Sequence, residues 1–266
     1  MTTDHSISRA TPAQRMQLFF WLHPEWWTVA LCGAAWLVML QHGWQHAGHG
    51  ALHRMSFPQE LVSWLLMVAA MMLPLVVDSV RATADASLWA RRHRAIAGFV
   101  VGYLAPWAAV GVVAVGVRQL SWIHTHAAPA LVFGMAALWL LTPMHRRGLV
   151  ACHRRRPLAP LGWRADRDCL AFGGTIGRAC VSSCWPLMLA CALTGHALVA
   201  MIGGMGVSLI ERWSFRPRIR AAALGALALA IYFGVQAGWD SGVSTNAPHS
   251  VELHEPPILC TGSVAE

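Results

Sequence analysis

The sequence contains no lysine and few charged residues of any kind. Only 12% of its 266 residues are charged, which is about half the fraction that is usual in soluble globular domains. In contrast, 56% of the residues are hydrophobic. A chain this apolar is not intrinsically disordered, and its scattered glycines follow no collagen-like period. The composition therefore excludes an ordinary soluble protein and indicates a membrane protein.

The sequence also lacks the short motifs of the common enzyme classes. It has no Walker A loop, no nucleophile-elbow serine, no His-Glu-x-x-His pair and no Rossmann glycine fingerprint. Six of its seven cysteines lie in apolar stretches or in segments that we expect to face the reducing cytoplasm, so they do not suggest a disulfide framework. We expect a protein that is not an enzyme.

Long apolar stretches are what the sequence has in abundance. A membrane-spanning α-helix needs about 20 mostly apolar residues. Seven stretches approach this length, namely Trp27–Gly43, Leu61–Val77, Ile96–Val117, Ala127–Thr142, Ile176–Thr194, Ala197–Ile210 and Ala221–Trp239. The sequence therefore predicts an all-α, polytopic transmembrane helix bundle with about seven spans.

The arginines between these stretches predict an orientation. If the N-terminus is cytoplasmic, 17 of the 20 arginines lie in inside segments, whereas Arg54 and Arg118 lie outside and Arg178 lies within a span. Basic residues favour the cytoplasmic side, so we expect a bacterial inner-membrane protein with its N-terminus inside and its C-terminus outside. We expect the arginines to contact anionic lipid headgroups and not nucleic acid.

This topology divides the chain into three parts. Residues 1–26 form a cytoplasmic N-terminal arm, residues 27–239 form the membrane domain, and residues 240–266 form a flexible external tail without basic residues. Neither end is long enough to hold a core of its own. We expect a single domain.

A stripe of soft sulfur groups lies in the fifth stretch. Cys180, Cys184, Met188 and Cys191 fall on one face of a helix, within an arc of about 80°. Thiolate and thioether ligands select Cu(I) and similar soft ions. The alternative interpretation is that these side chains only fill space in an apolar helix.

A second stripe lies in the second stretch, where Met67, Met71, Pro74 and Asp78 share one face of a continuous helix. If the two helices are neighbours, a rise of about 1.5 Å per residue places Asp78 level with Arg178 and Met71 level with Cys184. Met67 then lies level with Met188. The two faces together would form one column of thioether and thiol groups, with the charged side chains of Asp78 and Arg178 at its cytoplasmic end.

These stripes yield a specific set of expected metal ligands. We expect Cys184 and Met71 to bind the metal directly, with four further candidates: Cys180, Met188, Met67 and Asp78. The expected metal is copper(I). We expect Arg178 to pair with Asp78 or Glu211, because an unpaired charge in the membrane is unfavourable. Alternatively, Asp78 and Arg178 extend to the cytoplasmic interface.

Two prolines lie within the spans. Pro74 and Pro186 each remove a helical hydrogen bond and leave a carbonyl near residues 70 and 182 without its donor. Such carbonyls are tolerated where protein or a polar cavity satisfies them. Ser182 and Ser183 are the local candidates, and each proline either shapes a site or only bends its helix.

Histidines gather outside the membrane in the predicted topology. His42, His46, His49 and His53 follow a helical spacing, although Gly43, Gly48 and Gly50 argue against a stable helix there. They are candidates for capturing a metal ion from outside. The cytoplasmic segment 143–169 holds two histidines and two cysteines, but its seven arginines disfavour a bound cation.

Over Leu61 to Trp213 the chain resembles a bacterial family of uncharacterised, predicted metal-binding integral membrane proteins. The resemblance is carried by Ala69-Ala70-Met71-Met72-Leu73-Pro74, Gly102-Tyr103 with Trp107, Cys152, Gly173 and Gly177 before Cys184-Trp185-Pro186-Leu187-Met188, and Glu211-Arg212. The family usually has a cysteine where this chain has Ser183, and another where it has Gly148. The resemblance implies a polytopic membrane protein that binds a metal.

The sequence thus favours a membrane protein that handles or delivers a soft metal, with a site between the second and fifth spans. It leaves two alternatives open. One is an accessory or assembly subunit of a membrane complex, in which the Met, Cys and Trp side chains are packing. The other is an ion-coupled solute transporter that uses Asp78, Arg178 and Glu211.

Overall fold

All regular secondary structure in the described part of the chain is helical. The computed structural model describes residues 11–13, 15–16, 23–46, 56–120, 128–154, 156–159, 161–213 and 219–245. Within these ranges it has nine helices and no strand, namely α3 (Trp26–His46), α4 (Phe57–Met72), α5 (Val77–Asp85), α6 (Arg92–Leu120), α7 (Ala128–Leu140), α8 (Pro143–Cys152), α9 (Gly162–Leu193), α10 (Leu198–Trp213) and α11 (Ile219–Thr245). The all-α prediction is confirmed.

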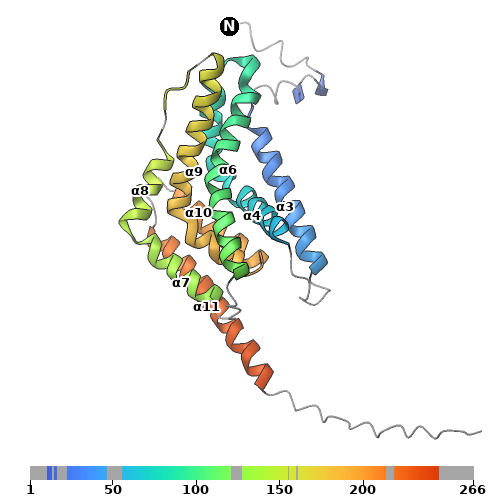
Figure 1. The fold of residues 1–266 in the computed structure, drawn as a ribbon, viewed down its shortest axis with the longest axis vertical. Helices are drawn as coiled ribbons and strands as arrows, with labels where there is room; N and C mark the ends of the chain where they lie inside the picture. The colour runs from blue at the N-terminus through green and yellow to red at the C-terminus, as the bar shows by residue number, and fades with distance from the viewer. Residues whose placement is uncertain are drawn as a thin grey trace, which may run out of the picture.

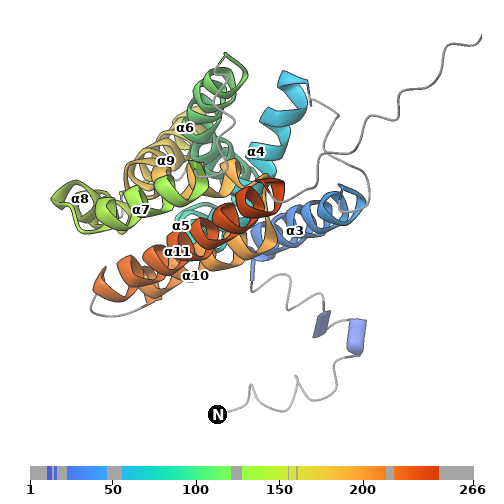
Figure 2. The ribbon, with the colours of Figure 1, turned by 90° about the horizontal axis from the view of Figure 1, so that it is seen from below.

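Helices α6 and α9 form the centre of the fold. They stand side by side in Figure 1, with α3 and α4 on one side and α7 and α8 on the other. Figure 2 shows α11 along α7 and close to α10. Gly173 allows the backbones of α6 and α9 to touch, since a methyl group there would overlap the carbonyl oxygen of Phe99. This close contact holds the two longest helices of the described chain together.

The number of spans is smaller than the sequence predicts. Three helical segments of the described chain are long and apolar enough to cross a membrane, namely Trp89–Gln119, Gly162–Leu193 and Ile219–Trp239. The count rises to five if each of two bent helix pairs is one span. The prediction of seven spans is therefore wrong, although several long apolar helices do indicate a multi-pass membrane protein.

Two physical features explain the difference. Hydropathy counts apolar residues without regard to bends, yet the chain bends by 48° between α4 and the segment Pro74–Asp85 and by 75° between α7 and α8. In addition, α10 has only 16 residues, a length of about 24 Å, and it ends in the charged pair Glu211 and Arg212. The hydrocarbon layer is about 30 Å thick.

Both prolines leave a free carbonyl where the sequence predicts one, and an indole from another helix satisfies it. The carbonyl oxygen of Ala70 accepts hydrogen bonds from Trp36 Nε1 at 3.0 Å and from the Cys32 thiol at 3.3 Å. The carbonyl oxygen of Ser182 accepts one from Trp139 Nε1 at 3.1 Å. The expected local donors do not take this role, because the hydroxyl of Ser182 bonds to Ala179 O and that of Ser183 bonds to Cys180 O.

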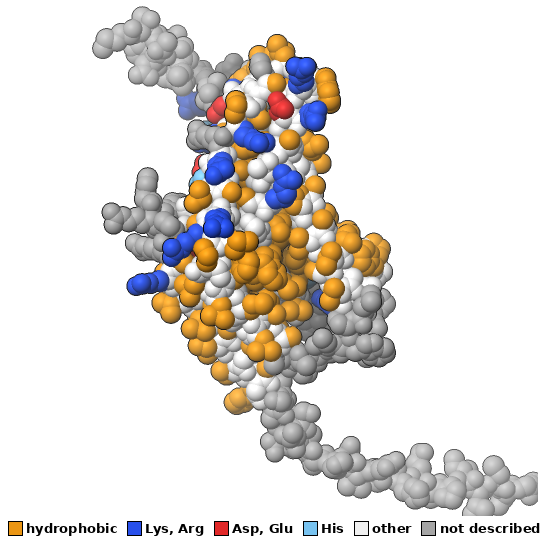
Figure 3. All heavy atoms as spheres, turned by 60° about the vertical axis from the view of Figure 1, so that its left-hand side comes forward, with side chains coloured by type: hydrophobic (Ala, Val, Ile, Leu, Met, Phe, Trp, Pro, Cys, Tyr) orange, Lys and Arg blue, Asp and Glu red, His pale blue; other side chains and the backbone are white. Residues whose placement is uncertain are grey.

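The outer surface combines apolar and basic side chains. Exposed leucines and isoleucines such as Leu131 and Ile231 cover the helices, as is expected where they face lipid acyl chains. Figure 3 shows that, on the face it views, most arginine side chains lie in the upper part and apolar side chains predominate below them.

Several predictions fall outside the described residues. The structure does not describe most of the N-terminal arm, residues 47–55, residues 121–127 or residues 246–266. These ranges hold His49, His53 and much of the predicted external tail, and the side chains of His42 and His46 are likewise not described.

Candidate metal centre

Helix α8 supplies two side chains of the candidate centre, His145 and Cys152. Thr142 caps its first turn, because the hydroxyl accepts a hydrogen bond from the backbone N–H of His145 at 3.3 Å. Pro143 occupies the first helical position, where its missing N–H is not needed. Since a residue that precedes proline avoids the helical conformation, α7 stops and the chain turns into α8 at the 75° bend.

Gly148 then brings α8 against α9. A methyl group at this position would lie 2.6 Å from Ser182 Oγ and 3.1 Å from the carbonyl oxygen of Ala179. Only a residue without a side chain permits this approach. The approach brings Cys152, at the end of α8, to the middle of α9.

Three thiols meet where α8 contacts α9. Cys180 is fully buried, and Cys152 and Cys184 are each only 5% exposed. Arg212 Nη2 lies 3.5 Å from both Cys152 Sγ and Cys180 Sγ, and Cys184 lies one helical turn after Cys180 on α9. The structure thus brings together Cys180 and Cys184, as the stripe on α9 predicts, and adds Cys152 from α8.

Two further side chains surround Cys180. The thioether sulfur of Met72 lies 3.9 Å from Cys180 Sγ. The hydroxyl of Tyr103, from α6, donates a hydrogen bond to the same sulfur at 3.2 Å. Met72 and Tyr103 are both fully buried, so the thiol is shielded from solvent on these sides.

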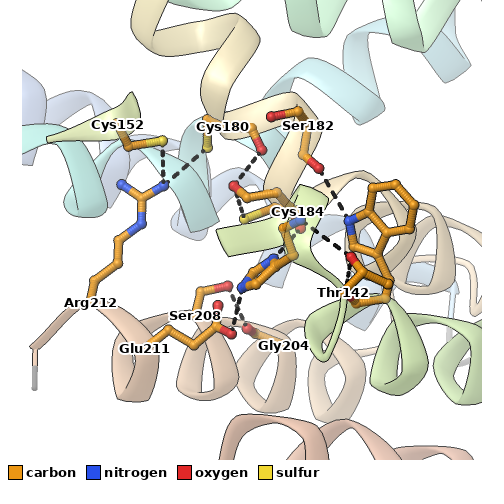
Figure 4. A network of polar contacts seen from close by, with 12 residues as sticks. Thr142, Cys152, Cys180, Ser182, Cys184, Gly204, Ser208, Glu211 and Arg212 are labelled. Carbon is orange, nitrogen blue, oxygen red and sulfur yellow. Dashed lines mark hydrogen bonds and ion pairs between the residues drawn. The ribbon is translucent and has the colours of Figure 1, made fainter. Parts of the chain in front are cut away.

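Arg212 is the charged group of the cluster. Its Nη2 donates hydrogen bonds to Cys152 Sγ and Cys180 Sγ, each at 3.5 Å, and its Nη1 donates to the carbonyl oxygen of Leu75 at 3.2 Å. Figure 4 shows the guanidinium directed at both sulfurs. The thiolate is the form of cysteine that binds metals, and a neighbouring guanidinium balances its charge. The cluster is thus a soft donor set with a built-in cation.

A second buried pair lies beside the thiols. His145 Nε2 lies 2.9 Å from Glu211 Oε1, and both side chains are almost inaccessible to solvent. The other ring nitrogen of His145 lies 3.0 Å from the carbonyl oxygen of Ser183. Since a carbonyl only accepts, this nitrogen carries the proton and donates. Ser183 Oγ in turn lies 3.3 Å from Cys184 Sγ, so the pair is connected to the thiol cluster (Figure 4).

The remaining predicted ligands lie elsewhere. The methyl group of Met71 and the sulfur of Cys191 each lie 3.1 Å from the point where a side chain on Gly204 would begin. Met67 and Met188 are fully buried in the same core. Asp78 is exposed, because the helix breaks at Pro74–Val76 and the predicted continuous face ends there.

The expected ion pair of Arg178 does not form. Within the described residues neither Asp78 nor Glu211 pairs with Arg178, and Glu211 instead contacts His145. Arg178 and Asp78 are both exposed. Exposure removes the need for a partner, since a long arginine side chain reaches water or headgroups at a membrane boundary.

Sequence reasoning missed four members of the centre: Cys152, Met72, Arg212 and His145. Cys152 and His145 were discounted because arginines surround them in the sequence, yet α8 turns both inward. The family resemblance offered a signal for three of the four. Met72, Cys152 and Arg212 all lie in the motifs that carry it.

The three cysteines do not by themselves form a metal site. Among the described residues, no group of three or more His, Cys, Asp and Glu side chains is arranged to hold a metal ion, and this includes Cys152, Cys180 and Cys184. The soft donors that meet are thiols and one thioether. This set fits a soft ion better than zinc, which usually takes four nitrogen or sulfur ligands in a tetrahedron.

A protein-family model described as PpoB2, copper chaperone, matches residues 61–235. The chain belongs to this family. The match includes the whole cluster from Met72 to Arg212, and membership makes the protein a copper-handling protein and not an enzyme. No curated protein and no solved structure matches the chain.

Proposed function

We propose that this protein binds Cu(I) at the buried cluster of Cys152, Cys180, Cys184 and Met72 and passes it to an acceptor protein. The observation that supports this most is the convergence of α4, α8 and α9 on one sulfur, that of Cys180. It lies 3.9 Å from the thioether of Met72 and shares the guanidinium of Arg212 with the Cys152 thiol. Thiolates and thioethers are the ligands that select Cu(I).

The surroundings of the cluster suit a transient cargo. Cu(I) in water is readily oxidised, and burial of the sulfurs keeps water away from the bound ion. Sulfur ligands of Cu(I) exchange through shared intermediates, so a partner that offers one or two further thiols or thioethers can draw the ion away. A chaperone needs this balance, since it must both hold and release its metal.

The other predicted sulfur ligands lie in the same buried core and could form a second copper position. Met71 lies beside Cys191 above Gly204, and Met67 and Met188 belong to the same buried core. These groups are candidates for a second position of the ion during its passage. Asp78 is the weakest candidate, because it is exposed and follows the break in the helix.

We also propose the location. The long apolar helices and the arginine-rich segment 143–169 support a bacterial inner-membrane protein in which this segment faces the cytoplasm. The arginines in the upper part of Figure 3 would contact anionic headgroups at the cytoplasmic surface.

Copper retention by the purified full-length protein tests the proposed site. The protein is loaded with Cu(I) under reducing conditions, and bound copper is measured after removal of free metal. We expect Cys180→Ser to lose most of the copper, whereas Cys169→Ser retains it, because Cys169 is a buried cysteine of the same helix outside the cluster. Equal retention by the two folded variants would contradict the site.

A further inference from the structure

Arg212 is an unusual neighbour for a site that takes up a cation. It carries a permanent positive charge, and its guanidinium donates to Cys152 Sγ and Cys180 Sγ at 3.5 Å each. The acid next to it in the sequence, Glu211, is turned towards His145 at 2.9 Å. The carboxylate closest in sequence therefore does not balance the charge of Arg212.

We propose that Arg212 makes the cluster selective for a monovalent ion, by serving as the counter-charge of a bis-thiolate complex. This inference rests on the proposed copper site. Each metal–sulfur bond replaces an S–H bond and releases a proton to water. Cys152 and Cys180 then contribute two negative charges, Cu(I) contributes one positive charge, and Arg212 contributes the other. The loaded site is neutral.

A divalent ion in the same place leaves one positive charge uncompensated. Both sulfurs are nearly or fully buried, and an unbalanced charge beside them is poorly screened. A third thiolate, from Cys184, would restore neutrality only by placing one more anion in the core. The His145–Glu211 pair offers no relief, because one proton shared between Nε2 and Oε1, 2.9 Å apart, leaves the pair with no net charge.

The position of Arg212 is fixed independently of the sulfurs. Its Nη1 donates to the carbonyl oxygen of Leu75 at 3.2 Å, in the turn Pro74–Val76 that separates α4 from α5. A carbonyl in a regular helix already has its own N–H donor, so the break at Pro74 provides this acceptor. The guanidinium can therefore remain beside the sulfurs when an ion binds on their other side.

The opposite role for Arg212 is that of a competitor. A guanidinium that occupies the metal position would have to leave before the ion enters. Its removal would then strengthen copper binding. The two roles predict changes of opposite sign, so a single substitution distinguishes them.

The test is a competition between Cu(I) and Zn²⁺ on the full-length protein, followed by measurement of both bound metals. Arg212→Met removes the charge and retains a long side chain, whereas Arg212→Lys retains the charge and is the matched control. We expect the ratio of bound Cu(I) to bound Zn²⁺ to fall by about thirtyfold or more in Arg212→Met, the effect of removing one partner of a buried charge pair. The ratio should change little in Arg212→Lys. If Arg212→Met is not recovered folded, Arg212→Gln provides the same test.

Each result has one meaning. An unchanged ratio in the uncharged variant, or a rise in its Cu(I) binding, overturns the role of Arg212 while the copper site stands. An equal fall in Arg212→Lys also overturns it, because shape and not charge would then be responsible. Failure of the wild type to bind Cu(I) would instead reject the proposed function itself.

Discussion

Trp139 Nε1 donates a hydrogen bond of 3.1 Å to the carbonyl oxygen of Ser182, which Pro186 leaves without its helical donor. Ser182 lies between the two cysteines of α9 that belong to the thiol cluster. The turn of α9 before Pro186 is thus tied to α7, next to the cysteines of the cluster. The same arrangement recurs at Pro74, where Trp36 satisfies Ala70 O at 3.0 Å.

Removing one of these indole donors should destabilise the protein. We expect Trp139→Phe to lower the free energy of unfolding by about 1–3 kcal/mol, because a carbonyl at membrane depth loses its partner. Thermal unfolding in detergent measures this effect. Trp239→Phe is the control, since Trp239 is 74% exposed and should change stability little. A Trp139→Phe variant as stable as this control would show that the bond is dispensable.

The contact between α6 and α9 predicts a second effect. Gly173→Ala should cost about 1–3 kcal/mol or more, because the added methyl group overlaps the carbonyl oxygen of Phe99. Gly116→Ala is the matched control, since no atom lies within 4 Å of the methyl group there. The yield of folded protein after gel filtration reports the difference. If both variants are recovered equally well, the helices are not packed as closely as the structure indicates.

The buried pair of His145 and Glu211 predicts a non-additive result. Either His145→Leu or Glu211→Leu leaves one buried polar group unpaired, which costs about 3–5 kcal/mol. The double variant removes both groups and should recover much of the lost stability. Thermal unfolding of the two single variants and the double variant measures the coupling. Strictly additive losses would mean that the two side chains do not interact.

The structure also predicts acid sensitivity at the start of α3. Burial raises the pKa of Glu25, but hydrogen bonds from Arg81 and His23 outweigh it and hold the pKa below the ordinary value of 4.5. The folded state binds this proton less readily than the unfolded state. Glu25 therefore contributes stability that is complete above about pH 4.5 and is lost as the pH falls through the lowered pKa.

Comparison of the wild type with Glu25→Gln over this range tests the prediction. The stability difference between them should be constant at neutral pH and should shrink as the pH falls below 4.5. Arg81→Gln should weaken the same dependence, because Arg81 is the main partner of the carboxylate. A difference that grows on acidification would have the wrong sign.

The sequence predicts local features of this protein well. Hydropathy locates the apolar helices, and the rule for proline identifies the free carbonyls at residues 70 and 182. The spacing of Cys180 and Cys184 predicts a shared helix face, and the structure places both thiols together. Each of these inferences depends only on residues within one helix.

Features that depend on the meeting of distant segments could not be predicted in this way. The face that runs from Met67 to Asp78 assumes a continuous helix, but the break at Pro74–Val76 ends that face, and Met72 rather than Met71 lies next to Cys180. Cys152 and Arg212 join the cluster from α8 and α10. Their positions depend on the 75° bend before α8 and on the close approach at Gly148, which no periodicity reveals.

X-ray absorption at the copper edge tests the proposed centre most directly, because it identifies the atoms bound to the ion. Two full-length variants are compared with the wild type after loading with Cu(I). Cys152→Ser/Cys180→Ser/Cys184→Ser removes the cluster, and Cys32→Ser/Cys169→Ser/Cys191→Ser removes the same number of cysteines outside it. We predict sulfur ligands in the wild type and in the second variant, and their loss from the first. Copper bound mainly by nitrogen or oxygen in the wild type, or sulfur ligation that survives in the first variant, would contradict copper binding at these thiols.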